Sequence, residues 1–295
     1  MSDTILVTGA SGHLGDAVIR HLLDSQGVAP SRIVAASRNP DKLAPLADRG
    51  VTVRKADFDD PSGLEPAFAG VGTLLIVSTD ALDGAGTRLR QHLAAVAAAA
   101  KADVGRIAYT SLPNADTSKV SFAPDHLGTE KAIKATGLPY LIFRNSWYQE
   151  NLFMSLPQAL KTGQWYSAAG DGRTAFIARD DIAAAIAGAL ANPPAGSATY
   201  TLSGGEALTN DAIAALTSEV VGKPVQVVHV NDEQLAGGMK AAGVPDAVIP
   251  TLVSFDTATR AGDLAVVTGD AVKLSGRKLQ SVHTFLTSNK AALAG

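Results

Sequence analysis

A glycine-rich turn between a short apolar strand and a helix is the feature that most constrains this chain. Residues 4–7 are apolar or β-branched and predict a buried strand. Residues 16–23 carry apolar side chains at helical spacing. Between them, residues 8–15 read T-G-A-S-G-H-L-G, with the spacing G-x-x-G-x-x-G. Strand, glycine turn and helix in this order predict a site for the phosphates of a dinucleotide. A turn that binds no ligand is the alternative.

Each of the three glycines has a physical role in such a site. Gly9 permits the tight turn, Gly12 lets backbone N–H groups approach a pyrophosphate, and Gly15 lets the helix pack close to the strand. The positive end of the helix dipole then faces the phosphates. The residues predicted to form this phosphate site are Thr8, Gly9, Ser11, Gly12, His13, Leu14 and Gly15.

The end of the second predicted strand, residues 31–38, distinguishes between two cofactors. An acidic residue at this point binds the ribose 2′-OH of NAD, whereas an arginine accommodates the 2′-phosphate of NADP. Ser37 and Arg38 stand there, Lys42 follows one turn into the next helix, and the strand end carries no carboxylate. These three residues therefore favour NADPH as the cofactor. The alternative is that Arg38 is a solvated surface residue.

The rest of the chain alternates strands with helices. Further strands are predicted at 51–58, 71–78, 106–111, 140–144 and 198–202, and helices at 87–101, 125–136 and 182–191. This alternation predicts an α/β protein with a doubly wound parallel sheet of the Rossmann type. From Thr209 onward, short helices and strands predict a smaller C-terminal α/β lobe. The predicted NAD(P)-binding domain comprises residues 1–150 and about 175–204, and the substrate-side lobe about 151–174 and 205–295.

Ligands of doubly wound sheets bind beyond the C-terminal ends of the strands. Asp57, Ser78 and Ser111 stand at such ends and are predicted to join the glycine turn in one crevice. Asp57 is expected beside the adenine, or as the N-cap of the helix that begins near Pro61, and both can hold at once. Asp180 or Asp181 is expected to be a helix N-cap rather than a catalytic acid.

Composition excludes several other classes of function. The net charge is −3 with interspersed signs, which predicts no binding to nucleic acid or to a membrane surface. The chain has no cysteine, which excludes disulfides, thiolate metal sites and thiol catalysis and is compatible with a reducing compartment. No apolar run is long enough to span a bilayer. We expect a cytoplasmic protein without a metal site, either a monomer or a homodimer.

Several motifs together carry a resemblance to a known family. They are the glycine turn, S-R-N-P-D-K at 37–42, A-Y-T-S at 108–111, T-E-K at 129–131 and F-R-N-S-W-Y-Q-E-N at 143–151. With them the chain resembles the NmrA-like atypical short-chain dehydrogenases/reductases, in particular the type 2 NADPH:quinone oxidoreductases of bacteria, with triphenylmethane reductases as near relatives. The resemblance covers nearly the whole chain. It implies a flavin-free reductase that binds NADPH on a Rossmann domain and closes a small C-terminal lobe over it.

One departure from ordinary short-chain dehydrogenases bears on the chemistry. Those enzymes carry Y-x-x-x-K on one helix face, where the tyrosine donates a proton. Lys131 is present here, but Leu127 stands four residues earlier, so this face has no hydroxyl group. The family resemblance implies that Lys131 hydrogen-bonds the nicotinamide ribose. His126 is expected to be a helix-start residue rather than a substrate contact.

The missing acid points to an acceptor that needs little protonation. Reduction of a ketone forms an alkoxide, whose basicity approaches that of hydroxide, with a water pKa of about 15.7. Reduction of a quinone forms a phenolate-like anion, whose conjugate acid has a pKa of about 10. The need for a proton donor is therefore smaller by roughly 7 kcal/mol. We therefore expect direct hydride transfer to a quinone or another conjugated acceptor.

Aromatic and amide residues after the sixth strand are candidates for the acceptor site. The predicted substrate-binding residues are Tyr109, Asn145, Trp147 and Tyr148, with Phe153 and Trp165 as weaker candidates. The candidate catalytic residues are Lys131, Tyr109 and Asn145. A purely structural aromatic cluster is the alternative.

Two other functions fit the same sequence. An NAD(P) redox sensor that regulates a partner would bind dinucleotide without turnover. A reductase of cationic dyes would use the aromatic residues for cation–π contacts.

Overall fold

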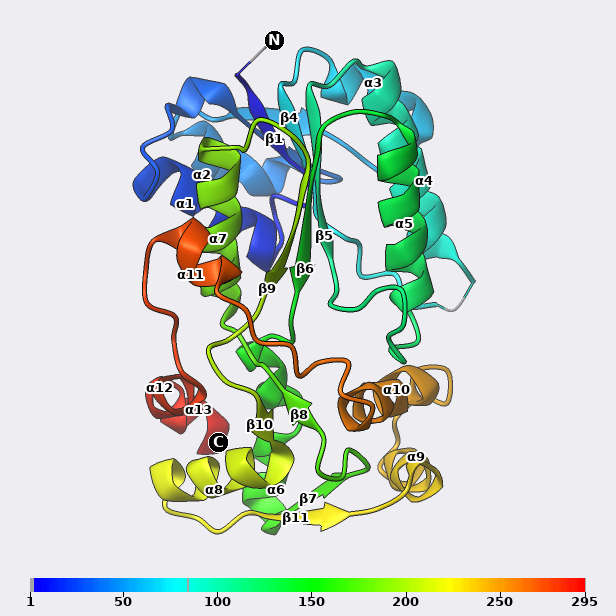
Figure 1. Cartoon of the computed structure of the whole chain (residues 1–295), viewed down its shortest axis with the longest axis vertical. Helices are drawn as coiled ribbons and strands as arrows, with labels where there is room; N and C mark the ends of the chain where they lie inside the picture. Colours follow the sequence, from blue (N-terminus) through cyan, green and yellow to red (C-terminus); the bar gives the residue numbers. More distant parts are fainter. Residues whose placement is uncertain (1–2, 84, 295) are drawn as a thin grey trace.

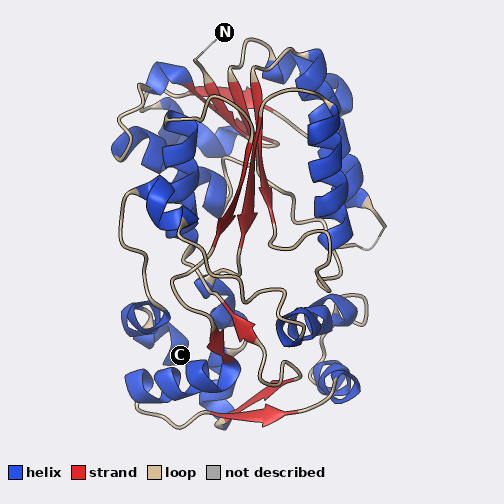
Figure 2. Cartoon of the chain, in the orientation of Figure 1, coloured by secondary structure: helices blue, strands red, loops and turns tan. Residues whose placement is uncertain are grey.

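The computed structural model describes residues 3–83 and 85–294, and a seven-stranded parallel sheet organises the fold (Figures 1 and 2). The strand order is β3-β2-β1-β4-β5-β6-β9. These strands are β1 (Ile5–Val7), β2 (Ile33–Ser37), β3 (Thr52–Lys55), β4 (Thr73–Ile76), β5 (Arg106–Ser111), β6 (Tyr140–Asn145) and β9 (Ala198–Leu202). The order reverses where β1 pairs with β4, which creates the switch point of a doubly wound sheet. The predicted Rossmann-type fold is confirmed.

Helices cover both faces of this sheet. One face carries α1 (His13–Asp24), α2 (Ala44–Ala47), α7 (Arg179–Ala191) and α11 (Asp270–Ser275). The other carries α3 (Pro61–Phe68), α4 (Thr87–Lys101) and α5 (Ala123–Ala135). The central strands are buried on both sides, and for this reason they read as continuous apolar runs such as Leu74-Leu75-Ile76. The chain also forms the 3-10 helices η1 (Pro30–Arg32), η2 (Pro40–Leu43) and η3 (Gln149–Met154).

A smaller lobe lies beyond the C-terminal ends of the strands, in the lower half of Figure 1. Its strands are β7 (Gln164–Ser167), β8 (Arg173–Thr174), β10 (Leu208–Thr209) and β11 (Gln226–His229). Its helices are α6 (Leu156–Thr162), α8 (Asn210–Val221), α9 (Asp232–Ala241), α10 (Ile249–Arg260), α12 (Val282–Ser288) and α13 (Lys290–Ala294). β7 pairs with β11 in parallel, and β8 pairs with β10 antiparallel. Leu156, Ile213 and Phe285 belong to a core cluster of this lobe.

One C-terminal segment returns from the smaller lobe to the sheet. α11 packs against α7, and Ala271 belongs to the core cluster beneath α1 and α7. The two helices lie so close together that a Cβ on Gly188 of α7 would overlap the carbonyl oxygen of Leu274 in α11. α11 therefore lies on the sheet side of the molecule (Figure 1), which differs from the predicted lobe of residues 205–295.

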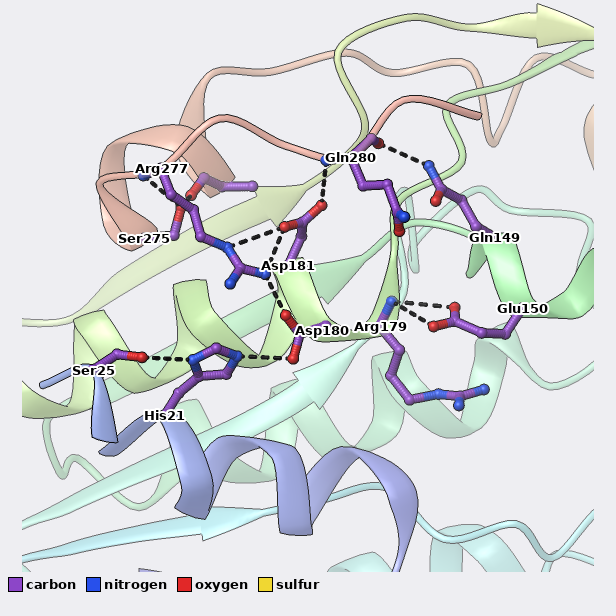
Figure 3. Close-up of polar contacts among 11 residues, drawn as sticks. His21, Ser25, Gln149, Glu150, Arg179, Asp180, Asp181, Ser275, Arg277 and Gln280 are labelled. Carbon is purple, nitrogen blue, oxygen red and sulfur yellow. Dashed lines mark hydrogen bonds and ion pairs between the residues drawn. The ribbon is translucent and has the colours of Figure 1, made fainter. Parts of the chain in front are cut away.

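The first turn of α7 holds this returning segment through two carboxylates (Figure 3). Asp181 accepts hydrogen bonds from Nε and Nη2 of Arg277, at 3.1 and 2.7 Å, and from the backbone N–H of Gln280 at 2.7 Å. Asp180 contacts Arg277 and lies 2.9 Å from Nε2 of His21, which comes from α1. We refer to residues 276–281 as the C-terminal strap.

The prediction that Asp180 or Asp181 caps α7 is wrong. The N-cap is Ala178, so both aspartates lie inside the first helical turn. There they complement the positive end of the helix dipole and bind the strap. The backbone N–H of Arg179 donates instead to the carboxylate of Glu150, whose oxygens lie 3.1 and 3.2 Å away.

No helix among the described residues has the combined length and apolar character that a membrane span requires.

Candidate active site

The glycine turn connects β1 to α1 at the switch point of the sheet. Gly9 has a φ of 60°, in the left-handed region that glycine adopts at little cost. A Cβ on Gly15 would overlap the carbonyl oxygen of Gly9, so the first turn of α1 packs directly on the loop. Gly12 is the N-cap, and no side chain caps α1 among the described residues. The N–H groups of this first turn therefore suit the binding of a phosphate.

Neighbouring side chains fix this turn in place. The Thr8 hydroxyl donates to the carbonyl oxygen of Leu75 and accepts from the N–H of Val77, both at 3.0 Å, which ties the turn to β4. The side chain of Leu14 is buried in the core, whereas His13 is exposed. Leu14 can therefore contribute to a ligand site only through its backbone.

The end of β2 lies next to the glycine turn. The hydroxyl oxygens of Ser11 and Ser37 lie 2.9 Å apart, and the N–H of Asn39 donates to Ser37. Arg38 and Lys42 are exposed beside them. Two hydroxyls and two exposed cations suit a phosphate group at this position.

Asp57 follows β3 and accepts a hydrogen bond from the N–H of Asp59 at 3.1 Å. The N-cap of α3 is Asp60, so the expected capping role of Asp57 is wrong. The helix begins at Pro61, immediately after Asp60, and Asp57 is too early in the chain to cap it. Its contact with adenine stays a prediction.

The ends of β4 and β5 are joined by hydroxyl groups. The N–H of Ser78 donates to the Thr110 hydroxyl at 2.8 Å, and that hydroxyl donates to the Ser78 hydroxyl at 3.2 Å. The Ser111 hydroxyl donates to Oε1 of Glu130 at 2.7 Å. Ser78 and Ser111 therefore stand at the same edge of the sheet as the glycine turn.

The face of α5 that packs on the sheet carries His126 and Glu130, and the Leu127–Lys131 face lies beside it. His126 and Glu130, at positions i and i+4, are buried with exposures of 3% and 0%. Leu127 is half-buried and Lys131 is exposed. Each residue step turns a helix by about 100°, so the inner pair begins one residue earlier than Leu127. A contact between Lys131 and the nicotinamide ribose stays a prediction.

Glu130 is a buried carboxylate that the sequence reasoning did not single out. Arg144 of β6 donates to it twice, from Nε at 3.0 Å and from Nη2 at 2.8 Å. With the bond from Ser111, this ion pair ties α5 to β5 and β6. The T-E-K and F-R-N motifs contain both partners, but only the fold brings them together.

Tyr109 is a buried core residue and does not line an accessible acceptor wall. Its exposure is 0%, and its hydroxyl oxygen lies 2.7 Å from Nδ1 of His126 and 3.3 Å from Nδ1 of His92. Side chains alternate along a strand, so Tyr109 points beneath α4 and α5 with Ile107. Burial raises the pKa of the Tyr109 phenol well above its usual range. The expected contact between Tyr109 and the acceptor therefore has no support in its geometry.

The two histidines beside Tyr109 are also buried. Burial and the nearby charge of Arg88 lower the pKa of His92 to about 3 and the pKa of His126 well below its ordinary value. Both rings are therefore neutral at physiological pH. His126 is not merely a helix-start residue, because its ring joins a hydrogen-bonded cluster between α4 and α5.

Buried polar atoms without a partner occur at the ends of β6 and β4. Asn145 Oδ1 and Ser146 Oγ are buried without a hydrogen-bond partner among the described residues, as is Thr79 Oγ1 after β4. Such atoms are rare because they cost free energy, so they mark a position where a polar ligand is expected. Burial raises the pKa of the Tyr148 phenol, three residues after Asn145. The guanidinium of Arg179 lies 5.3 Å from the centroid of the Tyr148 ring.

A cavity of about 700 Å³ opens in the smaller lobe. Its lining includes Trp147, which follows the end of β6 by two residues. Trp147 lines it and packs edge-on against Phe255, with ring centroids 4.7 Å apart. Trp165 and Phe176 also line it, whereas Phe153 packs on Phe285 in the lobe core. The volume lies in the range of small-molecule sites.

The cavity lining contains one charged side chain among the described residues, Asp256. Its Oδ2 accepts hydrogen bonds from the Ser167 hydroxyl at 2.9 Å and from the N–H of Ala168 at 2.6 Å. Burial raises the pKa of this carboxyl group.

These parts lie at one edge of the sheet. The strands β5, β6 and β9 end toward the smaller lobe (Figures 1 and 2), and the parallel arrangement directs β1, β2 and β4 the same way. The glycine turn and Arg38 occupy the β1–β2 end of this edge, and Asn145 and Trp147 the β6 end. Trp147 is the residue at which this edge meets the cavity lining.

Several known proteins are similar to this chain over nearly its whole length. Quinone oxidoreductase 2 of Escherichia coli strain K12 is 39% identical over 290 residues, which cover 97% of this chain and 100% of that protein. The crystal structure of the NADPH-dependent Escherichia coli enzyme in complex with NADPH matches with a TM-score of 0.91 and 37% identity, over 97% of this chain and 99% of that chain. Triphenylmethane reductase of Citrobacter sp., complexed with NADP(H), matches with a TM-score of 0.89 and 35% identity, over 97% of this chain and 100% of that chain.

The model of the NmrA-like family matches residues 1–281, nearly the whole chain. The two solved structures, with TM-scores of 0.91 and 0.89, share the fold of this chain over 97% of its length. The chain belongs to the NmrA-like family.

Proposed function

We propose that this protein is an NADPH-dependent oxidoreductase that reduces quinones by two electrons, through direct hydride transfer and without flavin. The observation that carries the proposal is a dinucleotide-type sheet edge at which β6 is followed, two residues later, by Trp147 in the lining of an aromatic cavity. The relative that is 39% identical over 97% of the chain is itself a quinone oxidoreductase.

The residues at the sheet edge fit NADPH. The uncapped first turn of α1 suits the pyrophosphate, and Arg38 and Lys42 suit the 2′-phosphate. Thr79 and Asn145, with their unpaired buried oxygens, lie on the β4–β6 side, where the nicotinamide end of the cofactor is expected. The bound cofactor supplies two electrons and a proton as hydride.

The protein's own residues align the acceptor and exclude water more than they donate protons. No acidic hydroxyl stands with His126 on the inner face of α5, and the pKa of Tyr109 is raised. A quinone suits such a site, because its reduced anion resembles a phenolate, and a phenol has a pKa of about 10. The rings of Trp147 and Phe255 supply an apolar wall against which a flat acceptor can stack.

Reduction of cationic dyes is a second candidate function. The single charged side chain in the described cavity lining, Asp256, is acidic and lies among aromatic rings. A conjugated cation would gain both charge attraction and cation–π contact there. The similarity to triphenylmethane reductase agrees with this candidate.

The experiment is NADPH oxidation by the purified protein against quinones, cationic triarylmethane dyes and aliphatic ketones. We expect a colourless protein that turns over quinones and hardly reduces ketones. Trp147→Ala should lower quinone turnover more than it weakens NADPH binding, because it removes the acceptor wall and leaves the phosphate site intact. Phe153→Ala is the matched control, since Phe153 lies in the lobe core outside the cavity lining.

Other outcomes would assign the protein differently. Dye turnover without quinone turnover would favour the second candidate. Rapid reduction of aliphatic ketones would contradict direct transfer without a proton donor. Tight NADPH binding without turnover of any acceptor would indicate a redox sensor. We further propose a cytoplasmic location and a monomer or homodimer, which fractionation and light scattering can test.

A further inference from the structure

Arg88, in the first turn of α4, is a buried cation without a carboxylate partner. The residue is 7% exposed. Its Nε donates to the carbonyl oxygen of Ala81 at 3.3 Å, its Nη1 lies 3.1 Å from Nε2 of His126, and its Cζ lies 4.7 Å from the centroid of the Phe122 ring. The charges of Asp125 and Asp80 act on the guanidinium, but in the part of the chain that the structure describes neither carboxylate forms an ion pair with it and Nη2 makes no hydrogen bond. An unpaired buried charge is costly, so its position indicates an anionic ligand.

His126 fixes the direction of this guanidinium. Arginine has no acceptor atom, so Nε2 of His126 must accept from Arg88 and carries no proton. The proton of the neutral ring is therefore on Nδ1, which donates to the Tyr109 oxygen at 2.7 Å. A protonated His126 would place a second positive charge against Arg88, which is one reason why its pKa is lowered.

His92 completes the cluster in the same neutral form. Its Nε2 accepts the N–H of Thr79 at 3.0 Å, so its proton is on Nδ1. Nδ1 lies 3.0 Å from the Thr129 hydroxyl, which itself donates to the carbonyl oxygen of Asp125 at 2.7 Å. Neither histidine carries a charge, and the cluster of Arg88, His92, Tyr109 and His126 holds one positive charge, on the guanidinium.

Three aromatic rings in successive contact connect Arg88 to the cavity. Below the guanidinium, Phe122 packs edge-on against Phe255 with centroids 6.1 Å apart, and Phe255 packs on Trp147 at 4.7 Å. Phe255 and Trp147 line the cavity. The charge of Arg88 also acts on the Tyr148 phenol after β6. Arg88 does not itself line the cavity, but Phe122 and Phe255 link it to the cavity lining. Its helix, α4, connects β4 to β5 and so belongs to the other side of the switch point from the turn after β1.

We propose that Arg88 stabilises the anion that forms on the acceptor during reduction, and that His126 is a positioning residue that aims its guanidinium. The proposal rests on the proposed function. Hydride transfer breaks a C–H bond of the reduced cofactor, oxidises the cofactor and converts the quinone into a hydroquinone monoanion. Water then supplies the one proton that completes the hydroquinone. Arg88 keeps all its protons and lowers the energy of the developing negative charge.

The kinetic test compares Arg88→Met, Arg88→Lys and Lys101→Met. Methionine removes the charge and keeps much of the length, lysine keeps the charge, and Lys101 is an exposed cation at the opposite end of α4. We expect Arg88→Met to lower kcat for a quinone by about tenfold to a hundredfold, with little change in NADPH affinity. Arg88→Lys should restore part of the loss, and Lys101→Met should match the natural protein.

A binding test separates this role from folding and from turnover. The probe is 4-nitrophenol, titrated by absorbance in the presence of NADP⁺. We expect the natural protein to bind the phenolate better than the phenol and to lower the apparent pKa of the bound probe. Arg88→Met should abolish this shift, and Lys101→Met should keep it. Circular dichroism of each variant reports whether it has folded.

His126→Leu tests the positioning role. It leaves Arg88 in place but removes the acceptor that aims it, so we expect a smaller fall in kcat than Arg88→Met causes, with the same direction of change in the probe titration. If Arg88→Met does not fold, kcat and the probe shift of Arg88→Lys and His126→Leu are compared with those of the natural protein instead.

The outcomes distinguish the two proposals. Unchanged kcat and an unchanged probe shift in folded Arg88→Met would overturn the role of Arg88. A loss of NADPH affinity with normal quinone kcat would also overturn it, because Arg88 would then be a cofactor contact. A probe shift in a natural protein that reduces no quinone would contradict the proposed function while supporting an anion site at Arg88.

Discussion

At the scale of single residues, the phosphate site is set by the absence of side chains and by two exposed cations. A Cβ on Gly15 would overlap the carbonyl oxygen of Gly9, whereas a Cβ on Gly12 would lie at 3.3 Å from the same atom. Gly15 is thus required by the packing of α1, and we propose that Gly12 leaves the space that a phosphate needs. Arg38 and Lys42 add charge at the end of β2.

The contrast between the two glycines gives a first prediction. Gly12→Val should leave a folded protein and abolish NADPH binding, because the side chain would occupy the expected pyrophosphate position. Gly15→Ala should lower the melting temperature, because its Cβ meets backbone atoms that cannot easily move. Calorimetry and thermal denaturation measure the two effects. Tight NADPH binding by Gly12→Val would show that the pyrophosphate lies elsewhere.

Arg38 gives a second prediction, on cofactor choice. A charge-assisted hydrogen bond contributes about 1.5–3 kcal/mol, which corresponds to roughly tenfold to a hundredfold in affinity. Arg38→Ala should weaken NADPH by this factor and leave NADH nearly unchanged, since NADH lacks the 2′-phosphate. Titration of both cofactors measures it, with Arg20→Ala, an exposed residue of α1, as the control. Equal affinities of the natural protein for NADPH and NADH would refute the assignment.

At the scale of elements, α4, β5 and α5 enclose a polar cluster within an apolar layer. Tyr109 comes from β5, His92 and Arg88 from α4, and His126 from α5. The ion pair of Glu130 with Arg144 links α5 to β6 in the same region. A polar cluster of this kind fixes how two helices sit on a sheet, because its hydrogen bonds have direction whereas apolar contacts do not.

The same cluster predicts how stability depends on pH. The pKa of His92 is about 3 in the folded protein and about 6.5 in an unfolded chain, and the pKa of His126 is also lowered. The unfolded chain therefore binds protons that the folded chain excludes. The free energy of unfolding should fall as the pH drops from about 6.5 toward 3, by about 1.4 kcal/mol per pH unit for His92, and His126 should add to the fall in the same direction.

Urea denaturation between about pH 7 and 5.5 measures this slope where few carboxylates titrate. His92→Gln should reduce the slope if the variant folds, and His283→Gln, which changes an exposed histidine, should not. A free energy of unfolding that does not change with pH over this interval would contradict the neutral, buried state of the two rings.

At the scale of the whole molecule, the chain crosses between sheet and lobe more than once. The C-terminal strap passes from α11, on the sheet, to α12, in the smaller lobe, and Asp181 holds it midway (Figure 3). We propose a division in which residues about 262–281 belong with the sheet, and the remaining residues of 151–174 and 205–295 form the lobe.

Asp181→Asn tests the importance of the strap for the assembled molecule. The change removes the charge that binds Arg277 and leaves the N–H of Gln280 with a weaker acceptor. We expect the free energy of unfolding to fall by about 1–3 kcal/mol. Solvent screens the charge of Arg277, which is 37% exposed, so the fall should lie toward the lower end of this range. Hydrogen exchange should become faster in residues 276–281, while the sheet stays protected. Asp16→Asn, in an exposed ion pair of α1, is the control. Uniformly faster exchange would argue against a local role.

The sequence by itself determined the sheet and the glycine turn at its switch point, because both depend on local patterns. Apolar strands, helical spacing and glycine positions are properties of neighbouring residues, and Arg106–Ser111 and Thr87–Lys101 were bounded correctly from them. The tertiary structure alone decided which side chains meet. Tyr109 and Asn145 both stand on strands in the A-Y-T-S and F-R-N motifs, yet one is locked beneath two helices and the other lies at the sheet edge. A rotation of about 100° separates the inner Glu130 from the exposed Lys131. Arg88 and His126 lie 38 positions apart, and only the packing of α4 against α5 brings the guanidinium onto the imidazole.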